Sequence, residues 1–554
     1  MARILALFLA VALSLSNPAS ALWPLPKSLQ TGTSTLTLAP NFAINLSVKN
    51  APSDLKAAVA QTKTYLQKDA LGRLVVGRGS SDAAGLKSAS KLSSLTVSLD
   101  SGAGKVQSIS AEAILPIESR DEAYTLSVPT SGAATLKANS TLGLYRGLTT
   151  FAQLWYEYEN TIYTIEAPIE IDDAPAYPYR GFMLDTARNY FPVSDILRTL
   201  DAMSWVKINT FHWHVVDSQS FPLEIPGFAN ITALGAYSAQ EVYTAADVAQ
   251  IVAYAGARGI DVIPEIDTPG HTAIIANAYP EHVACNDLTP WASFANEPPA
   301  GQLRFALPAT VSFTTNLLAA ASSLFPGSYF STGGDELNAA CYTQDTLTQQ
   351  QLNKTGQTIS QALSNFTVTT HAALEAKGKT PVVWEEMVLA HNVTLANDTI
   401  VVVWISSDNV AAVAQKGFRV VHAASNAFYL DCGGGGWVGA NPAGNSWCDP
   451  FKTWQAAYAF DPLANLTAAE AKLVLGGQHL LWTEQSGPSN LDSIVWPRAA
   501  SSAELFWSGA GGNVSTALPR LHDVAFRMKQ RGVGAIALQP LWCALRPGAC
   551  DLTA

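Results

Sequence analysis

The sequence predicts an α/β fold in which a (β/α)₈ barrel follows a smaller α+β domain. Three observations predict it. Residues 22–174 are rich in Ser, Thr, Ala and Leu and contain short alternating strands. Residues 175–510 repeat strand, loop and helix, and polar or aromatic residues gather where eight candidate strands end. In such a barrel the carboxyl ends of the strands meet at one rim, and residues 511–554 are expected to pack on its outside.

The composition is that of a large folded protein. The 554 residues are 48% hydrophobic and 14% charged, which argues against disorder and allows two or three domains. The formal net charge of -11 disfavours nucleic acid and anionic membrane as partners. The 14 Trp suit a protein that binds flat, partly apolar ligands, although core packing explains most such rings.

Residues 1–21 have the pattern of a secretory signal peptide. Arg3 is followed by an apolar run over residues 4–15 and by small residues at 19–21. No later apolar run reaches the length that spans a membrane. We therefore expect a secreted, extracellular protein, with a vacuolar or lysosome-like location left open.

Export predicts oxidised cysteines and glycosylation. Sequence alone leaves many pairings open, and pairing between neighbours is favoured: Cys285 with Cys341, Cys432 with Cys448, and Cys543 with Cys550. No CxxC or His/Cys cluster indicates a metal, and no cofactor is expected. Asn-x-Ser/Thr acceptors occur at Asn45, Asn139, Asn230, Asn353, Asn365, Asn392, Asn397, Asn465 and Asn513.

The small domain is predicted to contain strands over 92–99 and 124–128 and helices over 53–70 and 142–156. We find no catalytic constellation in it. A stretch rich in Asp, Pro and Tyr at 172–179 marks the boundary with the barrel.

The barrel strands are expected at 180–184, 209–215, 260–265, 328–332, 381–384, 400–404, 419–421 and 478–482. Between the second and third lies the clearest helix, with Thr244 as N-cap, Asp247 three residues on, and Gly259 past its end. A doubly wound open sheet is the alternative, but no GxGxxG follows any of these strands.

The fourth predicted strand ends in two glycines followed by Asp335 and Glu336. Neighbouring side chains on a strand point to opposite faces, so both carboxyls can serve one cavity only if the backbone leaves strand geometry, which glycine permits. Two close carboxyls in a half-dry site cannot both ionise easily, so one keeps its proton as a general acid. Glycoside cleavage needs this division, although an exposed loop pair is the simpler explanation of a bare dipeptide.

Other strand ends carry polar and aromatic residues too. They are Asp185, Arg188, His212, His214, Asp217, Glu265, Asp267, His271, Trp384, Glu385, Glu386, Trp404, Tyr429, Asp431, Trp482 and Glu484. Gathered at one rim, they would surround Asp335 and Glu336.

Six motifs carry a family resemblance: Gly181-Phe-Met-Leu-Asp185-Thr-Ala-Arg188, His212-Trp-His-Val-Val-Asp217, Pro264-Glu-Ile-Asp-Thr-Pro-Gly-His271, Gly333-Gly-Asp335-Glu336, Val383-Trp384-Glu385 and Trp496-Pro-Arg498. In order and spacing they resemble the family 20 glycoside hydrolases, the exo-acting β-N-acetylhexosaminidases, from about residue 23 to the C-terminus. The secreted, six-cysteine layout is similar to fungal members. The resemblance implies a retaining reaction in which the substrate's 2-acetamido oxygen is the nucleophile and an oxazolinium ion is the intermediate.

The resemblance also implies roles at matched positions. Glu336 would be the general acid and base, Asp335 the anion that orients the acetamido N–H, and Tyr429 a hydrogen-bond donor to the acetamido oxygen. Trp384, Trp404 and Trp482 would cage the acetamide methyl and the apolar sugar face, although each alone could be a core residue.

Further matched positions concern the sugar hydroxyls and the general acid. Arg188 would bind the 3- and 4-hydroxyls, and Asp431 and Glu484 the 4- and 6-hydroxyls, with an anion at Asp431 disfavouring 6-sulfated sugars. Asp217 and His271 would tune Glu336. His212, His214 and Glu265 are expected to make structural hydrogen bonds. In the Gly-rich insert after Asp431, Trp437 or Trp447 could stack on a second sugar or pack in the core.

The function implied is release of terminal non-reducing GlcNAc, and also GalNAc, from chitooligosaccharides and glycans. The alternatives are a disaccharide-releasing (lacto-N-biosidase-like) member and an inactive secreted sugar-binding protein; an endo-chitinase is disfavoured because DxxDxDxE is absent. The expected partner is an oligosaccharide with a terminal N-acetylhexosamine, with no nucleic acid and no membrane, and the resemblance allows a homodimer.

Overall fold

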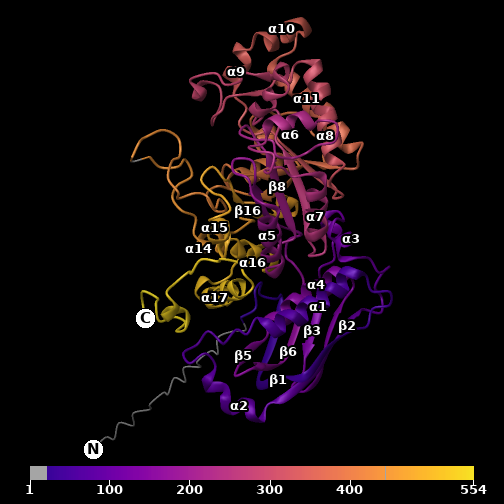
Figure 1. Cartoon of the computed structure of the whole chain (residues 1–554), viewed down its shortest axis with the longest axis vertical. Coiled ribbons are helices and arrows are strands. Elements are labelled where there is room, and N and C mark those ends of the chain that lie inside the picture. The colour runs from indigo at the N-terminus through magenta and orange to yellow at the C-terminus, as the bar shows by residue number, and fades with distance from the viewer. Residues whose placement is uncertain (1–20, 443) are drawn as a thin grey trace, which may run out of the picture.

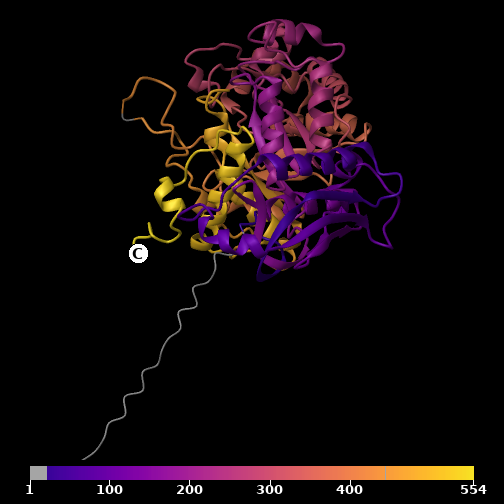
Figure 2. The ribbon, with the colours of Figure 1, turned by 60° about the horizontal axis from the view of Figure 1, so that its bottom comes forward.

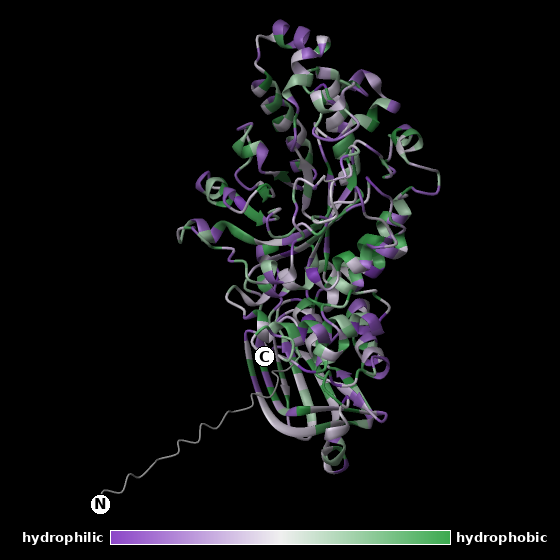
Figure 3. Ribbon diagram, turned by 90° about the vertical axis from the view of Figure 1, so that its left-hand side faces the viewer, coloured by the Kyte–Doolittle hydropathy of each residue, from purple (hydrophilic) through white to green (hydrophobic). Residues whose placement is uncertain are grey.

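The computed structural model describes residues 21–442 and 444–554, so the predicted signal peptide lies, apart from Ala21, outside the described residues. A barrel with surrounding helices occupies one end of the molecule, and a smaller domain lies across its other end (Figure 1). The curved sheet of the small domain stands out in Figure 3. The predicted α/β architecture is confirmed.

The small domain is a six-stranded sheet with helices on one face. In the sheet, β1 pairs in parallel with β2 and antiparallel with β6. Its helices α1 and α4 pack on each other and lie between the sheet and the barrel (Figure 1). The strands are β1 (Ser28–Leu46), β2 (Ser90–Leu99), β3 (Tyr124–Val128), β4 (Gly132–Ala138), β5 (Tyr156–Tyr158) and β6 (Thr161–Asp173), and the helices are α1 (Ser53–Lys68), α2 (Ala83–Ser88), α3 (Ile109–Ala113) and α4 (Thr141–Gln153).

In the described part of the chain, eight parallel strands close into a barrel, with β16 pairing to β7. Most of their residues are buried on both faces, which explains the continuous apolar runs of the sequence. They are β7 (Tyr179–Asp185), β8 (Thr210–Val216), β9 (Asp261–Ile266), β12 (Tyr329–Gly333), β13 (Thr380–Trp384), β14 (Ile400–Val403), β15 (Arg419–His422) and β16 (Val474–Leu481). All eight predicted strands are present. A short hairpin of β10 (Val283–Ala284) and β11 (Gln302–Leu303) lies in a connection.

Helices surround the barrel and continue beyond it. In α7 the predicted capping box is formed between Thr244 and Asp247. The helices are α5 (Val193–Trp205), α6 (Ala229–Gly235), α7 (Ala245–Gly256), α8 (Pro308–Ser322), α9 (Ala339–Gln344), α10 (Thr346–Thr355), α11 (Ile359–Glu375), α12 (Glu386–Leu389), α13 (Asn409–Gln415), α14 (Trp454–Tyr458), α15 (Leu491–Val495), α16 (Arg498–Ser508), α17 (Val514–Gln530) and α18 (Leu541–Ala544). The C-terminal segment lies beside both domains (Figure 2).

A buried ionic cluster joins the two domains. The Glu122 carboxylate accepts hydrogen bonds from Arg146 of α4 at 2.7 Å, from Arg180 of β7 at 2.6 Å and from Asn209 at 3.0 Å. These charges hold the pKa of Glu122 at about 2, because the two guanidinium groups outweigh the effect of burial. The small domain is thereby fixed to the barrel end opposite the strand carboxyl ends.

Three disulfides join neighbouring cysteines of the described chain, Cys285–Cys341, Cys432–Cys448 and Cys543–Cys550. The asparagines of all nine acceptor sequences are exposed. Within the described residues, no helix is both long and apolar enough to cross a membrane.

Replacing Glu122 with Gln should lower the free energy of unfolding by about 3–5 kcal/mol, because two buried guanidinium groups lose their counter-charge. Denaturant titration measures this. The matched control is Glu118→Gln, which breaks a half-exposed pair with Arg419 and should cost only about 0–1 kcal/mol. Equal losses in the two variants would contradict the assigned role.

Candidate active site

The turn after β12 directs two adjacent carboxyl groups toward one side chain, that of His271. Gly333, Gly334 and Glu336 have φ of +63°, +100° and +54°, so the chain leaves strand geometry at this point, as the sequence predicts. Asp335 is buried, whereas the Glu336 side chain keeps 26% of its surface exposed. Asp335 is therefore the more desolvated member of the pair.

Gly333 and Gly334 have no room for a side chain, in addition to having positive φ. A Cβ on Gly333 would lie 2.0 Å from Asp267 Oδ1, and one on Gly334 would lie 2.5 Å from Met387 Cγ. The Gly334 N–H donates to Asp267 Oδ1 at 2.7 Å. The turn thus depends on close packing against the ends of β9 and β13.

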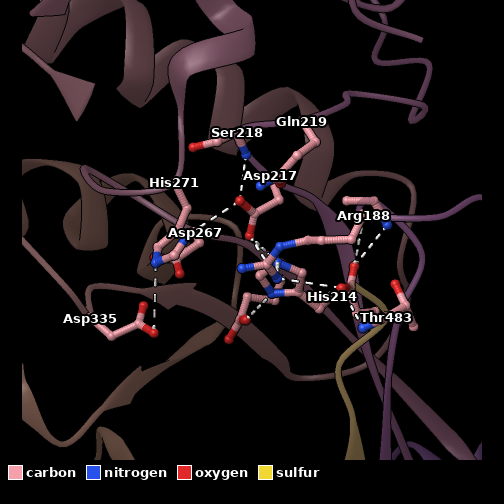
Figure 4. Close-up of polar contacts among 12 residues, drawn as sticks. Arg188, His214, Asp217, Ser218, Gln219, Asp267, His271, Asp335 and Thr483 are labelled. Atoms are coloured by element: carbon pink, nitrogen blue, oxygen red, sulfur yellow. Dashed lines mark hydrogen bonds and ion pairs between the residues drawn. The ribbon is translucent and has the colours of Figure 1, made fainter. Parts of the chain in front are cut away.

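His271 lies between Asp335 and Asp217 (Figure 4). Its Nδ1 is 3.2 Å from Asp217 Oδ1, and its Nε2 is 3.5 Å from Glu336 Oε2 and 3.9 Å from Asp335 Oδ2. Burial opposes a charge on the ring, but Asp217 and Asp335 raise the pKa of His271 well above its ordinary value. The ring is therefore a cation that faces both members of the dyad.

Without substrate, the surroundings of the dyad shift the pKa values of its two carboxyls in opposite directions. Burial and the neighbouring Asp267 raise the pKa of Asp335 well above its ordinary value. Burial alone would raise the pKa of Glu336 too, but the hydrogen bond and charge of His271 lower it. Over the pH range between these two pKa values the pair holds one proton, and that proton resides on Asp335.

Asp267, His271 and Asp335 each place one polar atom within 4.8 Å of the others. Asp217, His271 and Glu297 do the same. Both groups share His271, whose two ring nitrogens face carboxylates, Nδ1 toward Asp217 at 3.2 Å and Nε2 toward Glu336 at 3.5 Å. A third group contains Asp431 with Cys432 and Cys448, whose sulfurs are joined in a disulfide.

Arg188 is held by three carboxylates at the side of the pocket. It lies 3.4 Å from Asp185, 3.0 Å from Asp217 and 2.5 Å from Glu297. Its guanidinium also covers the Trp482 ring, 4.9 Å from the centroid. Together these contacts fix the guanidinium in one orientation.

Glu297 was not predicted. It lies in the irregular connection between β10 and β11, and Gln219 also donates to its carboxylate, at 3.1 Å. Asn296, its neighbour, hydrogen-bonds Glu336. No strand end or periodic pattern marks this connection, so the sequence carries no signal for it.

Four aromatic rings form a continuous wall, which we call the aromatic wall: Trp384, Trp404, Tyr429 and Trp482. Successive ring centroids, Trp384 to Trp482, Trp482 to Tyr429 and Tyr429 to Trp404, are 6.1, 6.5 and 6.3 Å apart. Trp384 is fully buried, whereas Trp404 and Trp482 are half-buried. Burial and nearby carboxylates raise the pKa of Tyr429 well above its ordinary value, so its hydroxyl stays a donor.

Two further predicted residues at this rim are partly buried acids. Burial raises the pKa of Asp431 to about 7, so the expected anion forms only as the pH rises through that value. Burial, then Glu297 and Asp185, raise the pKa of Glu484 to about 8 against the effect of Arg188. Asp431 Oδ1 accepts the backbone N–H of Trp482 at 3.4 Å.

His212 and His214 both bind Glu265, as expected of structural residues. His212 Nε2 is 3.0 Å and His214 Nδ1 is 2.6 Å from its carboxylate. In the Gly-rich insert, Trp447 is 66% exposed and meets Trp404 and Tyr429 edge-on, whereas Trp437 is 41% exposed. Neither ring of the insert belongs to the core.

Two adjacent carboxyl groups and an aromatic wall at the carboxyl-end rim of a barrel suit a glycoside hydrolase. Comparisons with known proteins agree. Residues 177–510 match the model of the glycosyl hydrolase family 20 catalytic domain, and residues 22–154 match a domain described as beta-acetyl hexosaminidase like. The chain belongs to glycosyl hydrolase family 20.

Individual relatives align over most of the chain. A beta-hexosaminidase of Arthroderma benhamiae is 35% identical, covering 78% of this chain and 74% of the relative. Beta-hexosaminidase 1 of Arabidopsis thaliana is 33% identical over 99% of this chain and 98% of its own. Among solved structures, the chitobiase of Flavobacterium johnsoniae has a TM-score of 0.74 at 27% identity, covering 93% of this chain and 73% of that one.

Asp267→Asn should shift the upper limb of the pH profile of kcat/KM to lower pH. The Asp267 carboxyl raises the pKa of Asp335, so its removal lets the shared proton leave at lower pH. The amide can still accept the Gly334 N–H. Initial rates across pH measure the shift, with exposed Asp287→Asn as the matched control. An unmoved limb, or one moved to higher pH, would contradict this coupling.

Proposed function

We propose that the chain is an exo-acting, retaining β-N-acetylhexosaminidase that removes terminal non-reducing GlcNAc, and also GalNAc, from chitooligosaccharides and glycans. One observation carries the proposal. Asp335 Oδ1 is buried without a hydrogen-bond partner among the described residues, beside the aromatic wall and next to Glu336. A buried carboxyl oxygen of this kind needs a donor, and the N–H of a 2-acetamido group supplies one.

The substrate supplies its own nucleophile. The acetamido oxygen forms a bond to the anomeric carbon while the glycosidic C–O bond breaks, and the leaving oxygen takes a proton from Glu336. The Tyr429 hydroxyl donates to the acetamido oxygen and orients it. Asp335 accepts the acetamido N–H and offsets the positive charge of the oxazolinium ion, which is preorganised electrostatic stabilisation.

This reaction needs the shared proton on Glu336, whereas the surroundings of the substrate-free dyad favour it on Asp335. An N–H donor at Asp335 favours the anion there, so substrate binding moves the proton to Glu336 without changing the net charge of the pair. His271 faces both carboxyls, and its charge remains in place during the transfer. The binding of an acetamido group thus creates the general acid.

The second half of the reaction opens the oxazolinium ion. Glu336, now an anion, takes a proton from a water molecule whose oxygen attacks the anomeric carbon. The C–O bond to the acetamido oxygen breaks and the amide is restored. Two displacements at one carbon give net retention.

The remaining contacts explain recognition. The aromatic wall covers the acetamide methyl and the apolar sugar face, and Arg188, Asp431 and Glu484 bind ring hydroxyls. The three carboxylates around Arg188 fix it as an end wall, so one sugar enters and the enzyme acts at chain ends. Trp447 lies beyond the wall, where a second sugar of the substrate would lie.

We infer that the chain is exported and glycosylated. The leader-like residues 1–21, three disulfides and exposed acceptor asparagines support this inference. A homodimer stays a prediction of the family resemblance.

Glu336→Gln should lower turnover of an unactivated GlcNAc glycoside by about 10²–10⁴-fold, because an amide cannot protonate the leaving oxygen. The wild-type enzyme should hydrolyse aryl GlcNAc and GalNAc glycosides and not an aryl lacto-N-biose glycoside. Exposed Glu375→Gln is the matched control, and a thermal melt confirms the fold.

Near wild-type turnover by Glu336→Gln would remove this residue from the role of general acid. Release of lacto-N-biose without hydrolysis of the GlcNAc glycoside would favour the disaccharide-releasing alternative.

Discrimination against 6-sulfated GlcNAc should increase as the pH rises through about 7, because Asp431 then becomes an anion and repels the sulfate. The measurement is the ratio of kcat/KM for 6-sulfo-GlcNAc and GlcNAc glycosides across pH. Asp431→Asn should flatten most of this dependence, and Glu484, with a pKa of about 8, accounts for the remainder. A ratio that is flat or rises with pH in the wild type would contradict the contact.

A further inference from the structure

A carboxyl group without a role in the reaction lies against the aromatic wall. Glu386 is the first residue of α12, directly after β13, and its Oε2 accepts the indole N–H of Trp404 at 2.8 Å. The preceding Glu385 is fully buried and accepts the backbone N–H of Trp404 at 2.9 Å and the side chain of Asn409 at 2.7 Å. Two adjacent carboxyls at the end of β13 therefore hold one tryptophan, by its backbone and by its ring.

Trp404 needs this support because it is a half-buried ring at the pocket edge. It stacks on Tyr429 with 12° between the planes and meets the exposed Trp447 edge-on at 5.6 Å. Its backbone carbonyl accepts the N–H of Ser425 at 2.7 Å, and its indole N–H donates to Glu386. This hydrogen bond sets the rotation of the ring against the space proposed for the acetamide.

The charges around Glu386 decide which form of the acid is present. The charged side chains beside it are acids, Asp335 from the end of β12 and Glu385 from its own turn, and His391 donates its backbone N–H to the Glu386 carbonyl oxygen at 2.8 Å. Burial first, and Asp335 next, raise the pKa of Glu386 to about 8. At mildly acidic pH the Glu386 carboxyl is therefore uncharged. Its carbonyl oxygen then accepts the indole N–H of Trp404, and Glu386 does not add a second negative charge beside Asp335.

We propose that Glu386 is a positioning residue for hydrolysis: its carboxyl accepts the indole N–H of Trp404 and so holds this ring against the space that the acetamido group of the substrate occupies. The inference rests on the proposed function, because the proposed function places an acetamido group of the substrate against the aromatic wall. It extends the site to a residue that touches neither the substrate nor the dyad's proton.

Glu386→Ala and Glu386→Gln separate this role from a merely structural one. Alanine removes the acceptor, so kcat/KM on a GlcNAc glycoside should fall by about 10- to 100-fold, with weaker inhibition by a GlcNAc-derived thiazoline and an unchanged thermal melt. Glutamine keeps an uncharged acceptor of the same length. It should restore most of the lost kcat/KM and give the wild-type pH profile below the pKa of Glu386.

Exposed Glu375→Gln serves as the matched control. The inference is overturned if Glu386→Ala stays within about twofold of the wild type, or if Glu386→Gln is as impaired as Glu386→Ala, which would mean that the site needs an ionised carboxylate. A wild-type enzyme inactive on GlcNAc glycosides would instead remove the proposed function itself.

Discussion

The site depends on one backbone turn that lets two neighbouring carboxyls face the same pocket. On a continued strand, Asp335 and Glu336 would point to opposite sides of the sheet, one into the barrel and one away from it. Left-handed φ at Gly333, Gly334 and Glu336 removes that constraint, and close packing of Asp267 and Met387 leaves room only for glycine. The other rim residues lie near this turn because the carboxyl ends of all strands in a closed barrel meet at one face.

The turn also decides where the proton resides. Asp335 is directed inward beside Asp267, where burial favours its neutral form, while Glu336 keeps contact with solvent and with the charged His271. In these surroundings Asp335 is not the anion, and Glu336 is not the proton donor, that the proposed glycoside cleavage needs. In the proposed reaction the pair becomes competent when a hydrogen-bond donor reaches Asp335, which would make the enzyme selective for sugars that carry an N–H next to the anomeric carbon. Selectivity and activation of the general acid have the same cause.

The sequence predicted the architecture and the members of the rim, because apolar strands that end in polar residues are a local pattern. It predicted the departure from strand geometry at the two glycines for the same reason. Where the dyad's proton lies before substrate binds could not be predicted, since it depends on Asp267, His271 and burial, which only tertiary structure brings together. Glu297 was missed because an irregular connection carries no periodic signal. The role of Glu386 could not be predicted either, because its partner Trp404 comes from a different strand.

The most direct test is a crystal structure of the enzyme with a GlcNAc-derived thiazoline, which mimics the oxazolinium ion. We expect the ring nitrogen to lie within hydrogen-bond distance of Asp335 and the sulfur to lie near the Tyr429 hydroxyl. The methyl group should contact Trp384, Trp404 and Trp482. A bound thiazoline whose bicyclic ring points away from Asp335 and Tyr429 would contradict the claim that the substrate's own amide attacks.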